Sequence, residues 1–369
     1  MSTLGAIVML SALVFFVMVH EAGHYVSARL TGMKVTEFFF GFGPRLWATV
    51  RGETTYGVKA IPAGGYVRIT GMNPFESVDP ADAGRTYREK KFWEKSVVVL
   101  AGVALHFVMA YLIVLLVIAL FGVPTGEVQL TVAAVVPESP AAASGVQDGD
   151  RIVTLDGEAI TDWGVLVEEI RGRPGSPVVV IVERDGELVS LSPVIGDTHP
   201  DSGEKVGYFG IVPEVTREFV GPFRAAGMAG RELITMIATA YEALFNLVRP
   251  DSLAKLAAVF TDGGESLPDN LRPTSPLGVA QIGAQVGALG LERFLVIMAF
   301  LNVFLGVLNG LPIYPLDGGH FAVAIYERVT HRRADVRKLA PIAAMVVVLL
   351  VFIGMVGLFL DIVNPINFG

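Results

Sequence analysis

Four long apolar stretches limit what this chain can fold into. The first begins at Leu4 and carries no charged residue as far as Val19. A bilayer core about 30 Å thick takes about 20 apolar residues as a helix, and helices satisfy their own backbone hydrogen bonds there. Of the 369 residues 52% are hydrophobic, gathered into these runs rather than dispersed. The sequence therefore predicts an α-helical polytopic membrane protein with about four spans: Leu4–Ala28, Val97–Val123, Phe294–Tyr314 and Leu339–Ile362.

The segments between these stretches differ in charge. The residues from Arg29 to Lys95 include 11 Lys or Arg against 7 Asp or Glu, whereas those from Glu127 to Arg293 include 12 against 24. The short segment before the last span is basic again. Because cytoplasmic loops carry an excess of Lys and Arg, we expect the two basic loops inside the cell. Both termini and the acidic central region are then expected outside.

The first basic loop has the pattern of a small β-structure. Residues 35–46 and 54–69 are β-branched and aromatic runs interrupted by Gly and Pro, which favours short strands and hairpins. An exposed strand edge beside a membrane site can pair with an extended peptide. A small sheet that serves only for packing is an equally good interpretation at this point.

The acidic central region begins with the pattern of a binding domain. Residues 139–152 (SPAAASGVQDGDRI) are followed by the run 155–160 (LDGEAI). This region of about 70 residues resembles a PDZ domain, and such domains bind extended peptides by strand addition. A domain that binds nothing and acts as a bulky gate is the alternative. The residues after it read as a linker, and 223–248 as an amphipathic helix lying on the membrane.

These features predict one order of segments along the chain. It is a first span (1–28), a cytoplasmic β-rich loop (29–96), a second span (97–123), an extracytoplasmic PDZ domain (126–196), a linker with amphipathic membrane-associated helices (197–293), a third span (294–320), a cytoplasmic loop (321–338) and a fourth span (339–362).

The first span ends in His20-Glu21-Ala22-Gly23-His24. Two histidines four residues apart lie about 40° apart on a helix, one turn on, so their rings can converge on one metal ion. Glu21 lies on an adjacent face, where it can accept a proton from a water instead of binding the metal. Because ionisable groups in a membrane helix are costly, they are functional by default. With no cysteine in the chain, any metal must be held by His and carboxylate groups.

A carboxylate for the same site follows the third apolar stretch. Residues 308–320 (LNGLPIYPLDGGH) place Asp317 in a backbone broken by Pro and Gly. Such a backbone is tolerated at membrane depth only around a buried site or cavity. The first and third spans run in the same direction, so His20, His24 and Asp317 lie toward the same membrane face. Two His and one carboxylate with an open position are typical of catalytic zinc.

Together these motifs resemble the site-2 protease family, in its bacterial branch with a PDZ domain. The resemblance implies an intramembrane metalloprotease of the inner membrane with one Zn²⁺ on His20, His24 and Asp317. It implies that Glu21 is the catalytic acid and base, and that Asn309 holds the substrate strand or the oxyanion. It implies single-span substrates such as anti-sigma factors, cut after an earlier extracytoplasmic cleavage. One departure is His106, which stands where the family often has Asn, and we expect a satisfied structural histidine there.

Two other function classes remain open from the residues alone. The first is a catalytically silent PDZ scaffold in the membrane, against which the intact set of His20, Glu21, His24 and Asp317 argues. The second is a metal transporter or sensor, which should offer polar groups along several spans. A net charge of −8 gives no reason to expect nucleic acid as a partner.

Overall fold

The computed structural model describes residues 3–73, 76–199, 204–264, 267–268, 271–287 and 290–366. The chain divides into two compact units. One contains the residues up to Ile118 and those from Pro222 onward, and the other contains Ala119–Gly221. The first unit carries the helices α1 (Thr3–Leu30), α2 (Phe92–Phe121), α5 (Pro222–Leu247), α6 (Pro250–Asp262), α7 (Pro276–Val286), α8 (Leu291–Gly310), α9 (Asp317–Thr330) and α10 (Ala340–Val363), with short 3₁₀ turns η1 (Pro80–Asp82), η2 (Tyr87–Glu89) and η4 (Val336–Leu339).

Four helical stretches among the described residues are long and apolar enough to cross a membrane. They are Thr3–Leu30, Phe92–Phe121, Leu291–Gly310 and Arg337–Val363. Each overlaps one of the predicted spans, so the structure has four candidate spanning helices where the sequence predicts them. The third stretch stops at Gly310, because Pro312 follows and cannot continue a helix.

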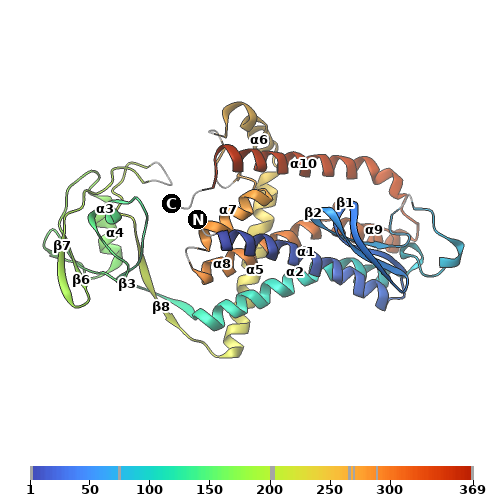
Figure 1. Cartoon of the computed structure of the whole chain (residues 1–369), viewed down its shortest axis with the longest axis horizontal. Helices are drawn as coiled ribbons and strands as arrows, with labels where there is room; N and C mark the ends of the chain where they lie inside the picture. The colour runs from blue at the N-terminus through green and yellow to red at the C-terminus, as the bar shows by residue number, and fades with distance from the viewer. Residues whose placement is uncertain are drawn as a thin grey trace. The chain divides into compact units, whose positions relative to one another are not determined.

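Helices α1, α2 and α8 run alongside one another, and α5 crosses them (Figure 1). The crossing is close because α5 presents Ala229 and Ala240, both fully buried, to α2 and α8. Helix α7 approaches α1 more closely still, since a Cβ added to Gly5 would lie 2.2 Å from the carbonyl oxygen of Gly283. The predicted amphipathic helix at 223–248 therefore exists as α5, and one of its faces packs on the spanning helices.

The fourth span, α10, packs on α6 and α7 at its C-terminal end. There the buried carboxylate of Asp361 accepts hydrogen bonds from the backbone amides of Ser275 (2.9 Å) and Gly278 (3.0 Å) at the start of α7. Arg272 lies 3.4 Å from the same carboxylate. Sequence reasoning did not single out Asp361, although a carboxylate within an apolar run is the signal that could have found it.

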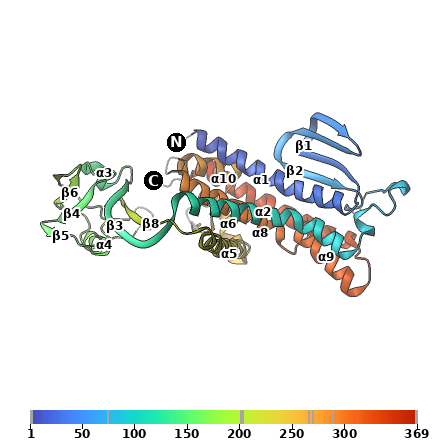
Figure 2. The ribbon, with the colours of Figure 1, turned by 90° about the horizontal axis from the view of Figure 1, so that it is seen from below.

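The β-rich loop contains two long strands, β1 (Val35–Arg51) and β2 (Thr54–Ile69), that pair antiparallel. Both bend, so that Phe38 has Val67 as one partner and Tyr56 as another (Figure 2). The bend in β1 requires glycine at position 41, where φ is +85° and a Cβ would lie 2.8 Å from the Ile61 carbonyl oxygen. The short strands and hairpins expected here are thus two long, folded-over strands.

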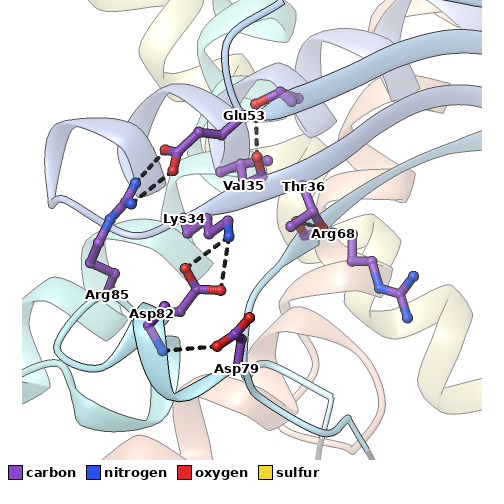
Figure 3. A network of polar contacts seen from close by, with 10 residues as sticks. Lys34, Val35, Thr36, Glu53, Arg68, Asp79, Asp82 and Arg85 are labelled. Atoms are coloured by element: carbon purple, nitrogen blue, oxygen red, sulfur yellow. Dashed lines mark hydrogen bonds and ion pairs between the residues drawn. The ribbon is translucent and has the colours of Figure 1, made fainter. Parts of the chain in front are cut away.

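Polar contacts tie the segment after β2 back to this sheet (Figure 3). Lys34 lies 2.8 Å from both carboxylate oxygens of Asp82, and Arg85 pairs with Glu53. Asp79 accepts from the backbone amide of Ala81 at 2.9 Å and so caps η1. These contacts hold the connection between the sheet and α2 against the sheet.

The second unit is a mixed domain with strands β3 (Val123–Val135), β4 (Arg151–Leu155), β5 (Glu158–Ala159), β6 (Val180–Arg184), β7 (Glu187–Leu191) and β8 (Ile211–Glu218), and helices α3 (Pro140–Ser144) and α4 (Trp163–Arg171). The order along the sheet is β7-β6-β4-β3-β8, with β5 beside β4. Its core includes Ile152, Leu166, Val182 and, from beyond the predicted boundary at 196, Phe209.

Two expected segments are corrected by these elements. The residues after 196 do not form only a linker, because β8 pairs with β3 along its length and covers the edge of β3 that faces away from β4. The segment 321–338 is not only a loop, because α9 occupies its first part. Phe321 and Ala324 of α9 face the core. The helix is too short for its sequence to resemble a membrane span.

Candidate active site

Three side chains meet where α1 lies beside the start of α9. The Nε2 atoms of His20 and His24 are 3.1 Å apart, and the Oδ2 atom of Asp317 lies 3.2 Å and 3.1 Å from them. The two histidines are 5% and 6% exposed. These three are the one group among the described residues whose ligand atoms could hold a metal ion, all within 4.8 Å of one another. The structure thus brings together residues that are 293 positions apart.

Asp317 reaches the histidines because α9 begins close against the end of α8. Cβ atoms at Gly318 and Gly319 would lie 2.2 Å from the Gly310 carbonyl oxygen and 2.4 Å from the Tyr314 amide nitrogen. Only glycine fits at such distances. Asp317 is the first residue of α9, so its carboxylate stands at the positive end of the helix dipole. Figure 1 shows α9 at the same end of the helix bundle as β1 and β2.

The orientation of His24 is set by the neighbouring helix. Its Nδ1 atom lies 2.7 Å from the Val98 carbonyl oxygen on α2, and a carbonyl only accepts, so Nδ1 carries a proton. Nε2 then faces His20 and Asp317 with its lone pair. When Nε2 of His20 also presents its lone pair, three lone-pair atoms lie about 3 Å apart, and they repel one another unless a cation lies between them. The donor set therefore fits a bound metal ion, and a backbone carbonyl on the outer nitrogen is the usual support for a metal-binding histidine.

Space for the two imidazoles comes from Gly102 on α2. A Cβ at this position would lie 2.4 Å from Nε2 of His24 and 2.8 Å from Cε1 of His20. The glycine is therefore part of the cradle around the three ligand atoms. Sequence analysis assigned no role to Gly102, because the contact is made between two helices.

Glu21 lies near this cluster but outside it. Strand β2 passes Glu21, since a Cβ at Gly65 would be 3.4 Å from its Cγ and the Val67 backbone is a hydrogen-bonding neighbour. Glu21 is half-buried and is not one of the three clustered residues. Asn309 is half-buried in the last turn of α8. The structure thus places Glu21 between the histidines and the sheet.

His106 is held inside the bundle by a partner from α8. Its Nδ1 atom lies 2.6 Å from Oδ1 of Asn302, and Nδ2 of Asn302 donates to the His106 carbonyl oxygen at 2.8 Å. Both side chains are buried, and the His106 ring centroid is 4.8 Å from that of His20. The histidine has hydrogen-bond partners, as we expected. Asn302 was missed, although a lone amide in an apolar run was the available signal.

A cleft of about 520 Å³ opens beside the cluster, lined by Glu37, Lys59, Tyr66, Arg68, Glu76, Tyr314 and His320, among others. Burial raises the pKa of the Glu37 carboxyl, but hydrogen bonds from Tyr66 and Arg68 outweigh it and leave the pKa below its usual value. For His320, burial disfavours the charged imidazolium and so lowers the pKa. The cleft thus presents an ionised Glu37 and a neutral His320.

Comparison with known proteins agrees with this geometry. The model of peptidase family M50 matches residues 8–354. "Zinc metalloprotease Rip1" of Mycobacterium tuberculosis (strain ATCC 25618 / H37Rv) is 32% identical over 98% of both chains. "Zinc metalloprotease Rip1" of Mycolicibacterium smegmatis (strain ATCC 700084 / mc(2)155) is 29% identical over 99% of this chain and 98% of that one. A solved PDZ domain of the SdrC-like protein from Listeria innocua covers 25% of this chain at 18% identity, with a TM-score of 0.21 that does not assign a fold. The match along nearly the whole chain shows that this protein belongs to peptidase family M50, the site-2 protease family, and is a metalloprotease.

Proposed function

We propose that this protein is an intramembrane zinc metalloprotease that hydrolyses peptide bonds within transmembrane segments. The observation that carries the proposal is the meeting of His20, His24 and Asp317 at the end of an apolar helix. Two imidazoles and one carboxylate leave a fourth position open, which is the ligand arrangement of catalytic zinc sites. Zinc, when bound, lowers the pKa of a coordinated water and polarises the scissile carbonyl.

The chain's own residues supply the proton transfers and the positioning. Glu21 is the general base that accepts the proton of the attacking water and later passes it to the leaving amine. Its place between the histidines and β2 suits this role. Asn309 is the proposed donor that steadies the tetrahedral oxyanion or the substrate strand. Val98 holds His24 in the tautomer that a ligand requires.

The substrate is bound in an extended form beside β2. A helix hides its peptide bonds, so a membrane segment must unwind before it is cut. The C-terminal part of β2, from Gly65 to Ile69, pairs with β1 on one side and passes Glu21 with its backbone. An extended peptide can add to such an edge. We propose single-span membrane proteins of the anti-sigma-factor type as substrates, cut after an earlier extracytoplasmic cleavage.

The second unit is proposed to be a PDZ domain that meets substrates outside the cell. Its support is the sequence motif at 139–160 and a cleft of about 310 Å³ between α4 and the segment 207–211. We propose that the protein lies in the inner membrane with both termini and this unit extracytoplasmic. The basic residues before α2 and α10 support that orientation.

Cleavage by the purified full-length protein tests the proposal. A tagged single-span substrate with its outer domain already trimmed is incubated with wild type, Glu21→Gln and Glu232→Gln, with and without a chelator. Glu232 is exposed on α5 and is the matched control. We expect wild type and Glu232→Gln to cut, and Glu21→Gln to keep its metal without cutting. Cleavage by Glu21→Gln would exclude the general-base role, and metal-loaded wild type that never cuts would favour the scaffold.

A further inference from the structure

Two cavities meet between η2, the start of α2, α9 and the start of α10. One measures about 270 Å³ and is lined mostly by polar side chains. The other measures about 530 Å³ and is lined mostly by apolar ones, including Pro312, Ile313, Ala322, Leu339 and Ile342. They share Tyr314, Val323, Ala334 and Asp335. The two cavities therefore adjoin and form one site with a polar and an apolar half.

The polar half carries an excess of positive charge. Its lining includes Arg88, Lys95, Arg333 and Arg337 against Glu327 and Asp335. Lys95 pairs with Glu327 at 2.7 Å, so that cation is already neutralised. Among the described residues, neither Arg333 nor Arg337 has a carboxylate partner within salt-bridge distance. Two arginines on a cavity wall without a salt-bridge partner favour an anionic ligand.

The same cavity contains a buried hydroxyl that needs an acceptor. Tyr87 is 8% exposed, and its hydroxyl has no hydrogen-bond partner among the described residues. The Lys95 ammonium lies 5.6 Å from the Tyr87 ring centre and can only donate. A buried donor left unpaired costs about 1–3 kcal/mol. An oxygen of an anion in the cavity would satisfy it.

The position of the site in the protein indicates which anion this is. Lys95 lies in the first turn of α2, and Arg337 begins the fourth spanning stretch. Both helices therefore enter the membrane beside the polar half, which stands at the level of the lipid headgroups. The apolar half lies against Leu339 and Ile342, the first residues of the span on the membrane side. A polar head and an apolar tail side by side are what a phospholipid offers.

We propose that this site binds one anionic phospholipid. Its phosphate lies at Tyr87, Arg333 and Arg337, and an acyl chain lies in the groove between α9 and α10. The site adjoins the candidate metal centre, because His320, one turn after Asp317 on α9, lines the polar half. The bound lipid would brace the helix that carries Asp317. A segment of a protein substrate is the other occupant that the groove could take.

Native mass spectrometry of the full-length protein in detergent tests the proposal, with phosphatidylglycerol and phosphatidylcholine as probes. The variants are Arg333→Gln/Arg337→Gln, which removes both cations, and Tyr87→Phe, which removes only the hydroxyl. Arg332→Gln is the matched control, since Arg332 lies in the same loop and does not line the cavity. We expect one phosphatidylglycerol per chain, bound about tenfold or more weakly by the double variant and more weakly by Tyr87→Phe, with Arg332→Gln unchanged.

Four results would overturn the proposal. The first is equal binding of phosphatidylglycerol by wild type and both cavity variants. The second is displacement of the lipid by millimolar inorganic phosphate, which would indicate a site for free phosphate. The third is loss of the lipid when a single-span peptide is added, which would make the groove a substrate site. The fourth is equal retention of phosphatidylcholine and phosphatidylglycerol, which would remove the role of the arginines.

Discussion

His24 and Val98 are joined by a 2.7 Å hydrogen bond from the imidazole Nδ1 to the backbone carbonyl oxygen. This contact makes α2 responsible for the direction of a side chain on α1. It also brings Gly102, one turn further along α2, against both imidazoles. The candidate metal centre thus depends on how closely two spanning helices approach.

Gly102→Ala is expected to disrupt the candidate metal centre. The new Cβ would lie 2.4 Å from Nε2 of His24, so an imidazole must turn away from Asp317. Changes around a metal ligand cost about 10–100-fold in metal affinity. Zinc content of the purified protein measured by elemental analysis checks this. Gly354→Ala on α10, where an added Cβ meets nothing within 4 Å, is the control and should retain metal as wild type does. Equal metal content in both variants would contradict the role of Gly102 in making room for the two imidazoles.

Asn302→Leu is expected to lower the stability of the helix bundle. It removes both hydrogen bonds of a buried pair and leaves His106 without its partner, at a cost of about 1–3 kcal/mol. Thermal unfolding in detergent measures the loss. The double variant His106→Phe/Asn302→Leu has no unpaired polar group and should regain part of the loss. If the double variant loses more stability than the two single variants lose together, this account is wrong.

Asp361→Asn is expected to loosen α10 from α7. The buried carboxylate holds the amides of Ser275 and Gly278 and lies beside Arg272. Breaking one member of a buried charged network costs about 3–5 kcal/mol. A lower midpoint of thermal unfolding in detergent is the expected result. Asp251→Asn, at an exposed pair with Arg249, should change the midpoint little. A similar loss in both variants would contradict the role of Asp361 in holding α10 to α7.

Asp150 is expected to make the second unit sensitive to acid. Its buried carboxylate accepts from Arg184 at 2.7 Å and from the Gln147 amide at 2.8 Å. Burial raises the pKa of Asp150, but these bonds outweigh it and leave the pKa below its usual value. A lowered folded-state pKa adds stability above the unfolded pKa of about 3.9, which is lost as the pH falls through the folded value.

Asp150→Asn should therefore cost about 2–3 kcal/mol near pH 7, and the difference from wild type should shrink below about pH 4. Trp163 reports on this unit, since it packs on its core. Urea unfolding followed by its fluorescence, in a Trp47→Phe/Trp93→Phe background, measures the difference. Glu183→Gln, at the exposed pair with Arg151, is the control. A difference that persists unchanged at pH 3 would contradict the assignment.

Much of the architecture could be predicted because its signals are local. The apolar runs that begin near Leu4, Val97, Phe294 and Leu339 correspond to the four spanning stretches. The family was identified from motifs of a few residues, and the match over residues 8–354 confirms it. The roles of Glu21 and Asn309, the zinc and the PDZ identity of the second unit stay predictions.

Elements with weak local signals were missed. Strand β8 lies in a polar stretch rich in Gly and Pro, and it is a strand because β3 offers it a partner. Helix α9 follows a broken backbone and is short, so the loop interpretation was natural. Contact with a segment distant in the sequence decided both: β8 pairs with a strand, and α9 packs on a core. No local pattern in the sequence contains these contacts.

The sequence by itself determined the class of protein, the spanning helices and the residue types of the candidate site, because hydrophobic length and motif spacing are written within single segments. The tertiary structure decided the rest. It set Asp317 against two histidines 297 and 293 positions away, turned His24 through a carbonyl on another helix, and opened room for both rings at Gly102. These are contacts between helices, and they form only when close packing fixes how the helices lie against one another.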